Sequence, residues 1–208
     1  NVLRSMWERG WSFIKKAGTI ILLSTIVVWF TSFFGWVDGT FQMLSEEQMD
    51  CSILANIGKA ICWIFAPLGW GNWQATVASI TGLIAKENIV GTLGILYNSD
   101  TATVYQNMGT AFTGITGFAF LALNLLCAPC FAAIGAIKRE MNETKWFWRA
   151  IGYQCGFAYV VALIVNQLGM VITGTFVLNP LNVISLVFAV AFLVLIVYMV
   201  VRPAKKRV

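Results

Sequence analysis

The chain has 208 residues, of which 59% are hydrophobic and 11% charged, and its mean hydropathy is +0.77. Soluble domains carry about 25% charged residues, so this composition excludes an ordinary soluble domain and indicates a membrane protein. The net charge of +5 is explained by membrane topology and contacts with anionic lipid, without a nucleic-acid partner. Histidine is absent, which excludes the commonest metal ligand and His-based catalysis.

In chain order, residues 1–16 alternate basic and aromatic side chains and are predicted to form an interfacial amphipathic helix. A window of about 20 residues then predicts clear membrane spans and two weaker ones. The clear spans are 17–37, 111–137, 147–170 and 181–201, and the weaker ones are 52–68 and 73–97. We therefore expect an all-α polytopic membrane protein with about six membrane-embedded segments, including broken or re-entrant elements.

Lys and Arg in short loops predict the orientation of these spans. They cluster before the first span, in residues 138–149, and after residue 201, whereas the loops 38–51 and 98–110 contain none. We expect the basic segments to be cytoplasmic, with both termini inside the cell. Residues 138–149 are thus expected to be a cytoplasmic loop and 150–208 to be C-terminal transmembrane helices with a basic tail. The chain begins without Met and contains no GxxxxGK[ST] stretch, so we expect the membrane part of a longer protein and no enzyme activity in this part.

Lys86, Glu87 and Asn88 stand consecutively inside an apolar stretch, TGLIAKENIVGTLGILY at residues 81–97. Two charges at a helix centre cost about 5 to 7 kcal/mol if they face lipid. We therefore expect Lys86 and Glu87 to lie in or beside a break and to face protein, and Gly91 to leave space beside Glu87. Two interpretations stay open. In the first, Lys86 and Glu87 pair with polar groups on neighbouring spans or lie at the cytoplasmic surface. In the second, they have a role in a transport path.

Cys127 and Cys130 flank Pro129 in the predicted span 111–137, in NLLCAPCFAAIGAIKRE. Pro129 removes a backbone donor and is expected to free a carbonyl near Leu125 or Leu126, so that thiol and carbonyl groups face one cavity. Broken elements of this kind are typical of transport paths. Cys62 and Cys155 are interpreted as small packed side chains.

Four blocks in order resemble the ferrous iron transport protein B family, in the C-terminal half of its membrane region. They are WSFIKKAGTIILLSTIVVWF, APLGWGNWQATVASITGLIAKENIVGTLGILY, APCFAAIGAIKRE and WFWRAIGYQCGFAYVVALIVNQLG. The resemblance implies a multi-pass protein of the bacterial inner membrane that imports Fe²⁺. It also implies that residues 17–137 are the second of two gate-like repeats, and that a cytoplasmic GTP-binding domain and the first gate belong to the same polypeptide.

By this resemblance Cys130 matches a gate cysteine, and Lys86 with Glu87 match the AKE of the preceding block. The transport path is thus expected to use Cys130, Cys127 and Glu87, supported by Lys86, Asn88, Pro129 and Gly91. Fe²⁺ is the expected substrate, no cofactor is expected in this chain, and GTP belongs to the other domain. Membrane lipid and the rest of the polypeptide are the expected partners, and a homo-oligomer is left open.

Two other functions stay open on the residues. One is a gate-type transporter for a nucleoside or organic anion, in which Lys86 contacts the substrate. The other is a membrane thiol oxidoreductase that uses Cys127 and Cys130.

Overall fold

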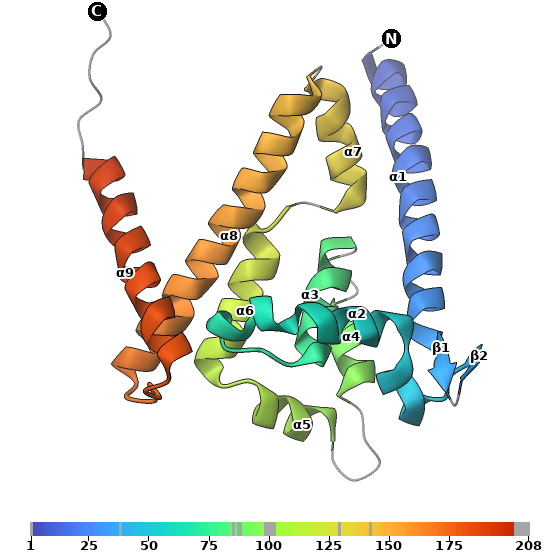
Figure 1. Cartoon of the computed structure of the whole chain (residues 1–208). Helices are drawn as coiled ribbons and strands as arrows, with labels where there is room; N and C mark the ends of the chain where they lie inside the picture. Colours follow the sequence, from blue (N-terminus) through green and yellow to red (C-terminus); the bar gives the residue numbers. More distant parts are fainter. Residues whose placement is uncertain are drawn as a thin grey trace, which may run out of the picture.

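The computed structural model describes residues 2–37, 39–84, 86, 89–97, 103–128, 130–141 and 143–201. These residues are mostly helical (Figure 1). The α-helices are α1 Val2–Phe33, α2 Ile53–Ile61, α3 Trp73–Ile84, α4 Ile89–Leu96, α5 Val104–Ala111, α6 Gly114–Leu126, α7 Phe131–Glu140, α8 Thr144–Ile172 and α9 Pro180–Val201. Short 3₁₀ helices are η1 Glu46–Cys51, η2 Cys62–Ile64 and η3 Ala66–Leu68, and the strands are β1 Phe34–Val37 and β2 Thr40–Met43.

A two-stranded hairpin corrects the all-α expectation. Strands β1 and β2 pair antiparallel, with Val37 opposite Thr40, and Gly39 adopts a positive φ of 80° in the turn. The predicted span 17–37 therefore ends as a helix at Phe33, and its last four residues are strand β1. An Asp-Gly pair between two apolar runs is a strong hairpin signal, and the helical interpretation of 17–37 overlooked it.

Two described helices are long and apolar enough to cross a membrane, α8 and α9, as the hydropathy predicts for 147–170 and 181–201. A third crossing is added if α5 and α6, which meet at 93°, count as one bent span. The predicted number of six segments is thus not confirmed. The weak span 52–68 consists of α2, which ends at Ile61, followed by the 3₁₀ turns η2 and η3. Pro67 lies in the first turn of η3, and Gly69 ends it with a φ of 100°.

Helices α3 and α4 form a hairpin and do not cross as one helix. Near the tip, the Thr81 and Thr92 hydroxyls lie 3.4 Å apart, and a Cβ on Gly82 would lie 2.6 Å from Ile89. At the open end, the Tyr97 hydroxyl donates to Asn72 Oδ1 at 3.2 Å. Segment 73–97 therefore starts and ends at the open end of the hairpin. Since α3 is about 18 Å long, neither arm spans a hydrocarbon core of about 30 Å.

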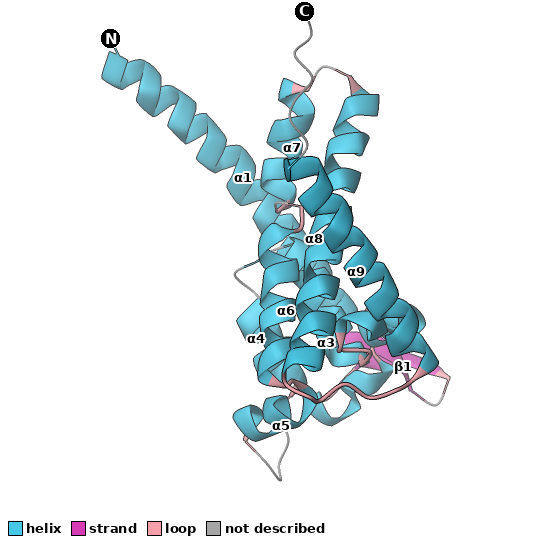
Figure 2. Ribbon diagram, turned by 90° about the vertical axis from the view of Figure 1, so that its left-hand side faces the viewer, coloured by secondary structure: helices cyan, strands magenta, loops and turns pink. Residues whose placement is uncertain are grey.

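The long elements run between two ends of the molecule (Figure 1). The start of α1, the turn between α7 and α8, and the end of α9 lie at one end. The β-hairpin, α5 and the turn between α8 and α9 lie at the other. Figure 2 shows α1 leaning away from the group formed by α6, α8 and α9 toward its N-terminal end. We call the first end the terminal end and the second the hairpin end.

The core lies where α6 and α8 pack antiparallel. Small residues on α8, Ala158 and Ala162, are fully buried and allow a close approach to Phe120 on α6. Trp70, from the turn after η3, is 1% exposed and meets the Phe120 ring edge-on at 5.4 Å. The pairing also explains why Gly169 is glycine, because a Cβ there would lie 2.5 Å from Ile115. A Cβ on Gly152 or Gly156, also on α8, would by contrast meet no atom within 4 Å.

Candidate functional site

The predicted break in span 111–137 separates α6 from α7. Helix α6 starts at a capping box, in which Thr113 and Thr116 satisfy each other's backbone N–H groups, and it ends at Leu126. Cys127 then turns extended, with ψ 169°, and Cys130 precedes the first residue of α7 with ψ 159°. The break therefore lies about 20 Å along the helix axis from the start of α6.

Lys86 connects the tip of the α3–α4 hairpin to this break. Its ammonium donates to the Leu125 carbonyl at 3.2 Å and to the Cys127 carbonyl at 3.3 Å. The Leu125 carbonyl belongs to the last turn of α6 and has no partner within the helix. A cation is also favoured at a helix C-terminus by the helix dipole. The prediction that Lys86 faces protein beside a break is therefore confirmed, and its partners are backbone carbonyls.

The other predicted site residues have different outcomes. Glu87, Asn88 and Pro129 lie outside the described residues. A Cβ on Gly91 would meet no atom within 4 Å, but the predicted space beside Glu87 falls outside the described residues. Cys130 is half-buried at the start of α7. The structure thus brings Lys86 to the backbone of Cys127.

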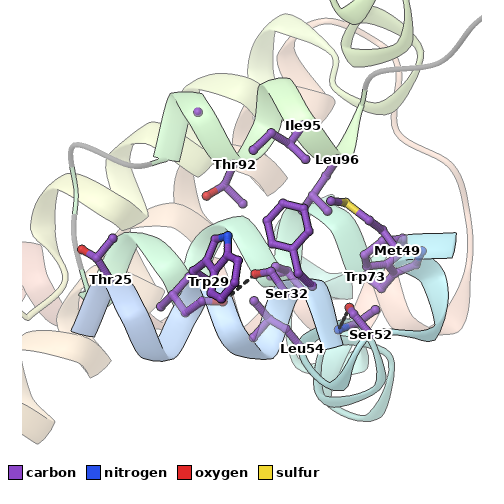
Figure 3. A pocket seen from close by; sticks show the side chains of 15 residues that line it. Thr25, Trp29, Ser32, Met49, Ser52, Leu54, Trp73, Thr92, Ile95 and Leu96 are labelled. Carbon is purple, nitrogen blue, oxygen red and sulfur yellow. Dashed lines mark hydrogen bonds between the residues drawn. The ribbon is translucent and has the colours of Figure 1, made fainter. Parts of the chain in front are cut away.

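Open volume flanks α4 on two sides. A cavity of about 230 Å³ separates α4 from α1, with Gly91, Thr92 and Leu96 on one wall and Trp29 and Ser32 on the other (Figure 3). A second cavity of about 510 Å³ lies between α4, α5 and α6. Both are lined mainly by apolar side chains, and neither is lined by Cys127 or Cys130. Helix α4 is therefore the least tightly packed arm of the hairpin.

Cys127 contacts a cysteine that the sequence pattern did not indicate. Its thiol lies 3.4 Å from the Cys155 thiol of α8. The expected thiol pair Cys127 and Cys130 is not the pair in contact, so the geometry does not favour a CxxC oxidoreductase. Cys155 packs against the core, as expected of a small packed side chain, and the Cys127 thiol is one of its contacts there. Nothing local signals this pair, because its members are 28 residues apart and meet only through the packing of α6 on α8.

Buried amides hold the interrupted segment after α2. Asn166 and Gln167 of α8 are fully buried, and both donate to the Pro67 carbonyl, at 3.4 and 2.7 Å. The Tyr159 hydroxyl donates to the Ile64 carbonyl at 2.7 Å. Irregular backbone at membrane depth needs such partners. The sequence pattern did not indicate these polar residues of α8, because they lie inside the apolar span 147–170.

A metal centre with several side-chain ligands is not found in the part of the chain that the structure describes. Among those residues, no group of three or more His, Cys, Asp or Glu side chains is close enough to hold an ion. Carbonyl and thiol groups at the α6–α7 break are therefore the donors that the described residues offer. Such a sparse set suits a transient stop for an ion better than a resident site.

Comparison with known proteins relates this arrangement to transporters. The Gate family model, described as nucleoside recognition, matches residues 14–144. The Fe(2+) transporter FeoB of Methanocaldococcus jannaschii is 37% identical over an alignment of 174 positions, which covers 81% of this chain and 25% of the relative. The Fe(2+) transporter FeoB of Staphylococcus aureus (strain COL) is 34% identical over 166 residues, 80% of this chain and 24% of the relative.

A fusion of Fe(2+) transport protein A with Fe(2+) transporter FeoB from Porphyromonas gingivalis is 28% identical over an alignment that covers 82% of this chain and 25% of that protein. No solved structure matches. The chain spans about a quarter of the length of these relatives. The matched region lies in their membrane part, and no GTP-binding domain is matched within it. The chain therefore belongs to the Gate family and corresponds to the Gate-containing membrane region of the FeoB family.

Proposed function

We propose that this chain is a membrane segment of a longer ferrous iron importer and forms part of its Fe²⁺ path and gate. The observation that carries the proposal is the meeting of two interrupted elements. The ammonium of Lys86, between α3 and α4, binds the carbonyls of Leu125 and Cys127 at the α6–α7 break. Interrupted helices that meet inside a membrane protein are typical of ion and substrate paths.

In the proposed path, Cys130, Cys127 and Glu87 contact the passing ion. Fe²⁺ binds weakly among the divalent transition ions, so a few thiol, carboxylate and carbonyl donors hold it only briefly. Brief holding favours conduction, because the ion also has to leave. A divalent cation that enters a negative-inside cell gains about 4.6 kcal/mol per 100 mV, which supplies the inward pull.

Lys86 acts as a closing group in this proposal. Its ammonium occupies carbonyls that would otherwise attract a cation, and its charge repels an ion that approaches the break. Opening then requires the hairpin tip to withdraw. The cavities of about 230 and 510 Å³ on either side of α4 give that arm room to move. Asn88, Pro129 and Gly91 support the tip and the break.

We propose a topology of four passages. Besides α8 and α9, which are long and apolar enough by themselves, α1 and the broken pair α6–α7 would cross the membrane. The α3–α4 hairpin would enter and leave from the hairpin end. Both loops without Lys or Arg, 38–51 and 98–110, then belong to the outer side, and the segment 138–149 to the cytoplasm. This arrangement keeps both termini in the cytoplasm with fewer crossings than six, in the inner membrane of a bacterium.

Uptake of radioactive iron tests the proposal in cells that lack their own importer and express the full-length protein. Cys130→Ser keeps the size of the side chain and removes the soft ligand, so we expect uptake to fall severalfold. Cys62→Ser is the matched control, because Cys62 is also half-buried and its thiol donates to the Lys59 carbonyl, three residues earlier, at 3.2 Å. Uptake by Cys130→Ser equal to that of the parent would reject the ligand role.

The description of the Gate family as nucleoside recognition calls for a second measurement. Uptake of labelled nucleosides is measured in the same cells. If nucleosides enter and iron does not, the substrate assignment is wrong, and Lys86 becomes the candidate substrate contact.

A further inference from the structure

We propose that Cys127 and Cys155 form a binding site for a soft metal ion of low coordination number, Cu(I) being the biological example. The site is distinct from the CxxC pattern in the sequence, and it does not depend on whether Fe²⁺ passes through this chain. Its two donors come from different helices, and the packing of α6 on α8 holds them together.

The geometry of the two thiols carries the inference. Their sulfur atoms lie 3.4 Å apart. With metal–sulfur bonds of about 2.3 Å, two sulfurs on one ion are about 3.8 Å apart at a tetrahedral angle and about 4.6 Å apart in a linear complex. A linear two-thiol complex therefore requires the two sulfurs to move apart by about 1.2 Å through rotation of the two side chains. Cys127 is 8% exposed, and Cys155 is only half-buried, so the site is shielded on one side and reachable on the other.

The backbone on both sides of the pair is fixed. Cys127 ends α6, where its N–H donates to the Leu123 carbonyl at 2.9 Å, and Cys155 lies in the middle of α8. The same two helices meet again about three turns away, where Ile115 packs on Gly169. Cys130 lies across the break, at the start of α7. The pair that shares a rigid frame is therefore Cys127 and Cys155.

Ligand number and charge favour a soft ion over Fe²⁺ or Zn²⁺. Thiolates select Cu(I), and Zn²⁺ requires about four ligands. Within the described residues no third His, Cys, Asp or Glu joins the two thiols. Binding of Cu(I) releases one proton from each thiol and leaves a bis-thiolate complex with one negative charge. The Lys86 ammonium, 3.3 Å from the Cys127 carbonyl, supplies a positive charge next to that complex.

Site-resolved alkylation tests the pairing without any mutation. The full-length protein, purified in detergent without oxygen, is incubated with one equivalent of Cu(I) and then with a maleimide, and each cysteine is quantified by mass spectrometry. We expect Cu(I) to slow the alkylation of Cys127 and Cys155 together by about tenfold or more, and to leave Cys130 and Cys62 unchanged. Phenylarsine oxide, which bridges two neighbouring thiols, should give the same pattern.

Two variants sharpen the result. Cys155→Ser should lower the affinity for Cu(I), measured by competition with a chromophoric chelator, by roughly tenfold or more, whereas Cys130→Ser should not change it. Joint protection of Cys127 with Cys130, or protection of neither Cys127 nor Cys155, would overturn the proposal. Equal Cu(I) affinity in Cys155→Ser and the parent protein would overturn it as well. None of these measurements depends on iron uptake, so their failure is separate from failure of the proposed transport function.

Discussion

Replacing Lys86 by Met tests whether the ammonium holds the hairpin tip against the α6–α7 break. Met has a similar length and is unbranched, but it donates no hydrogen bond. The change removes the contacts at 3.2 and 3.3 Å to the Leu125 and Cys127 carbonyls. It also leaves the Leu125 carbonyl in the last turn of α6 without its partner.

The free energy that Lys86→Met removes can be worked out from these two contacts. Hydrogen bonds to charged groups contribute about 1.5 to 3 kcal/mol each when they are short. Both contacts are longer than the usual charge-assisted distance, and Lys86 is partly exposed, so we assign about 1 kcal/mol to each. The total of about 2 kcal/mol corresponds to a roughly 30-fold larger population of the opened tip.

The alkylation rate of Cys127 reports this population, because Cys127 is 8% exposed in the closed arrangement. We expect Lys86→Met to raise that rate by roughly 30-fold in the full-length protein, in the regime where opening is fast compared with alkylation. Lys86→Arg keeps a cationic donor and should stay within a few-fold of the parent. Cys51, on η1, provides an internal control. A Cys127 rate in Lys86→Met within about twofold of the parent would show that the ammonium does not hold the tip.

Three further changes test the packing of the segment after α2 and the orientation of the chain in the membrane. Gly69→Ala should destabilise the protein by about 3 kcal/mol or more, measured as a lower melting temperature in detergent, because φ is 100° and the methyl would lie 2.5 Å from a side-chain carbon of α6; Gly152→Ala, in open space, should be nearly neutral. Gln167→Leu should cost about 1 to 3 kcal/mol, because the Pro67 carbonyl loses its shorter hydrogen bond, at 2.7 Å, and keeps the longer one from Asn166 at 3.4 Å; an unchanged melting temperature would contradict this. A cysteine in place of Lys145 should resist an impermeant maleimide added outside intact cells, and labelling there would reverse the predicted orientation.

The long helices were predictable from hydropathy because length and composition determine them. Helix α9 has 22 residues, and α8 extends the predicted span 147–170 by a few residues at each end. Lipid-facing side chains need only be apolar, so these helices can be predicted without knowing which residues pack against them. Exposed Leu, Val and Phe residues along α9 fit this view.

The hairpin of α3 and α4 was not predictable in the same way. Hydropathy measures the length of an apolar stretch, and residues 73–97 are long enough for one membrane crossing. Whether the chain continues or reverses depends on contacts such as Tyr97 with Asn72, between residues 25 positions apart. The three polar residues in the middle indicated a break, but a break alone does not determine the direction of the chain after it.

The candidate site was predictable where it depends on the backbone and not where it depends on tertiary packing. Pro129 indicated that α6 would end and that a carbonyl near Leu125 would need a partner, and Lys86 is that partner. The cysteine pattern indicated Cys130 as the neighbour of Cys127. The contact is instead with Cys155, since an extended turn separates Cys127 from α7, while α8 runs alongside α6.

The contacts of Lys86 at the hairpin tip lower the free-energy cost of placing a charged side chain in the membrane. A lipid-facing Lys costs about 2.5 to 3.5 kcal/mol, but two carbonyls and the negative end of α6 lower that cost at this position. A neutral donor such as Gln would satisfy the same carbonyls without any charge to place in the membrane. What the ammonium adds is repulsion of cations at the break, which a neutral donor lacks. The proposed control of cations therefore gives a reason for a positive charge at this junction, in addition to its favourable interaction with the C-terminal end of α6.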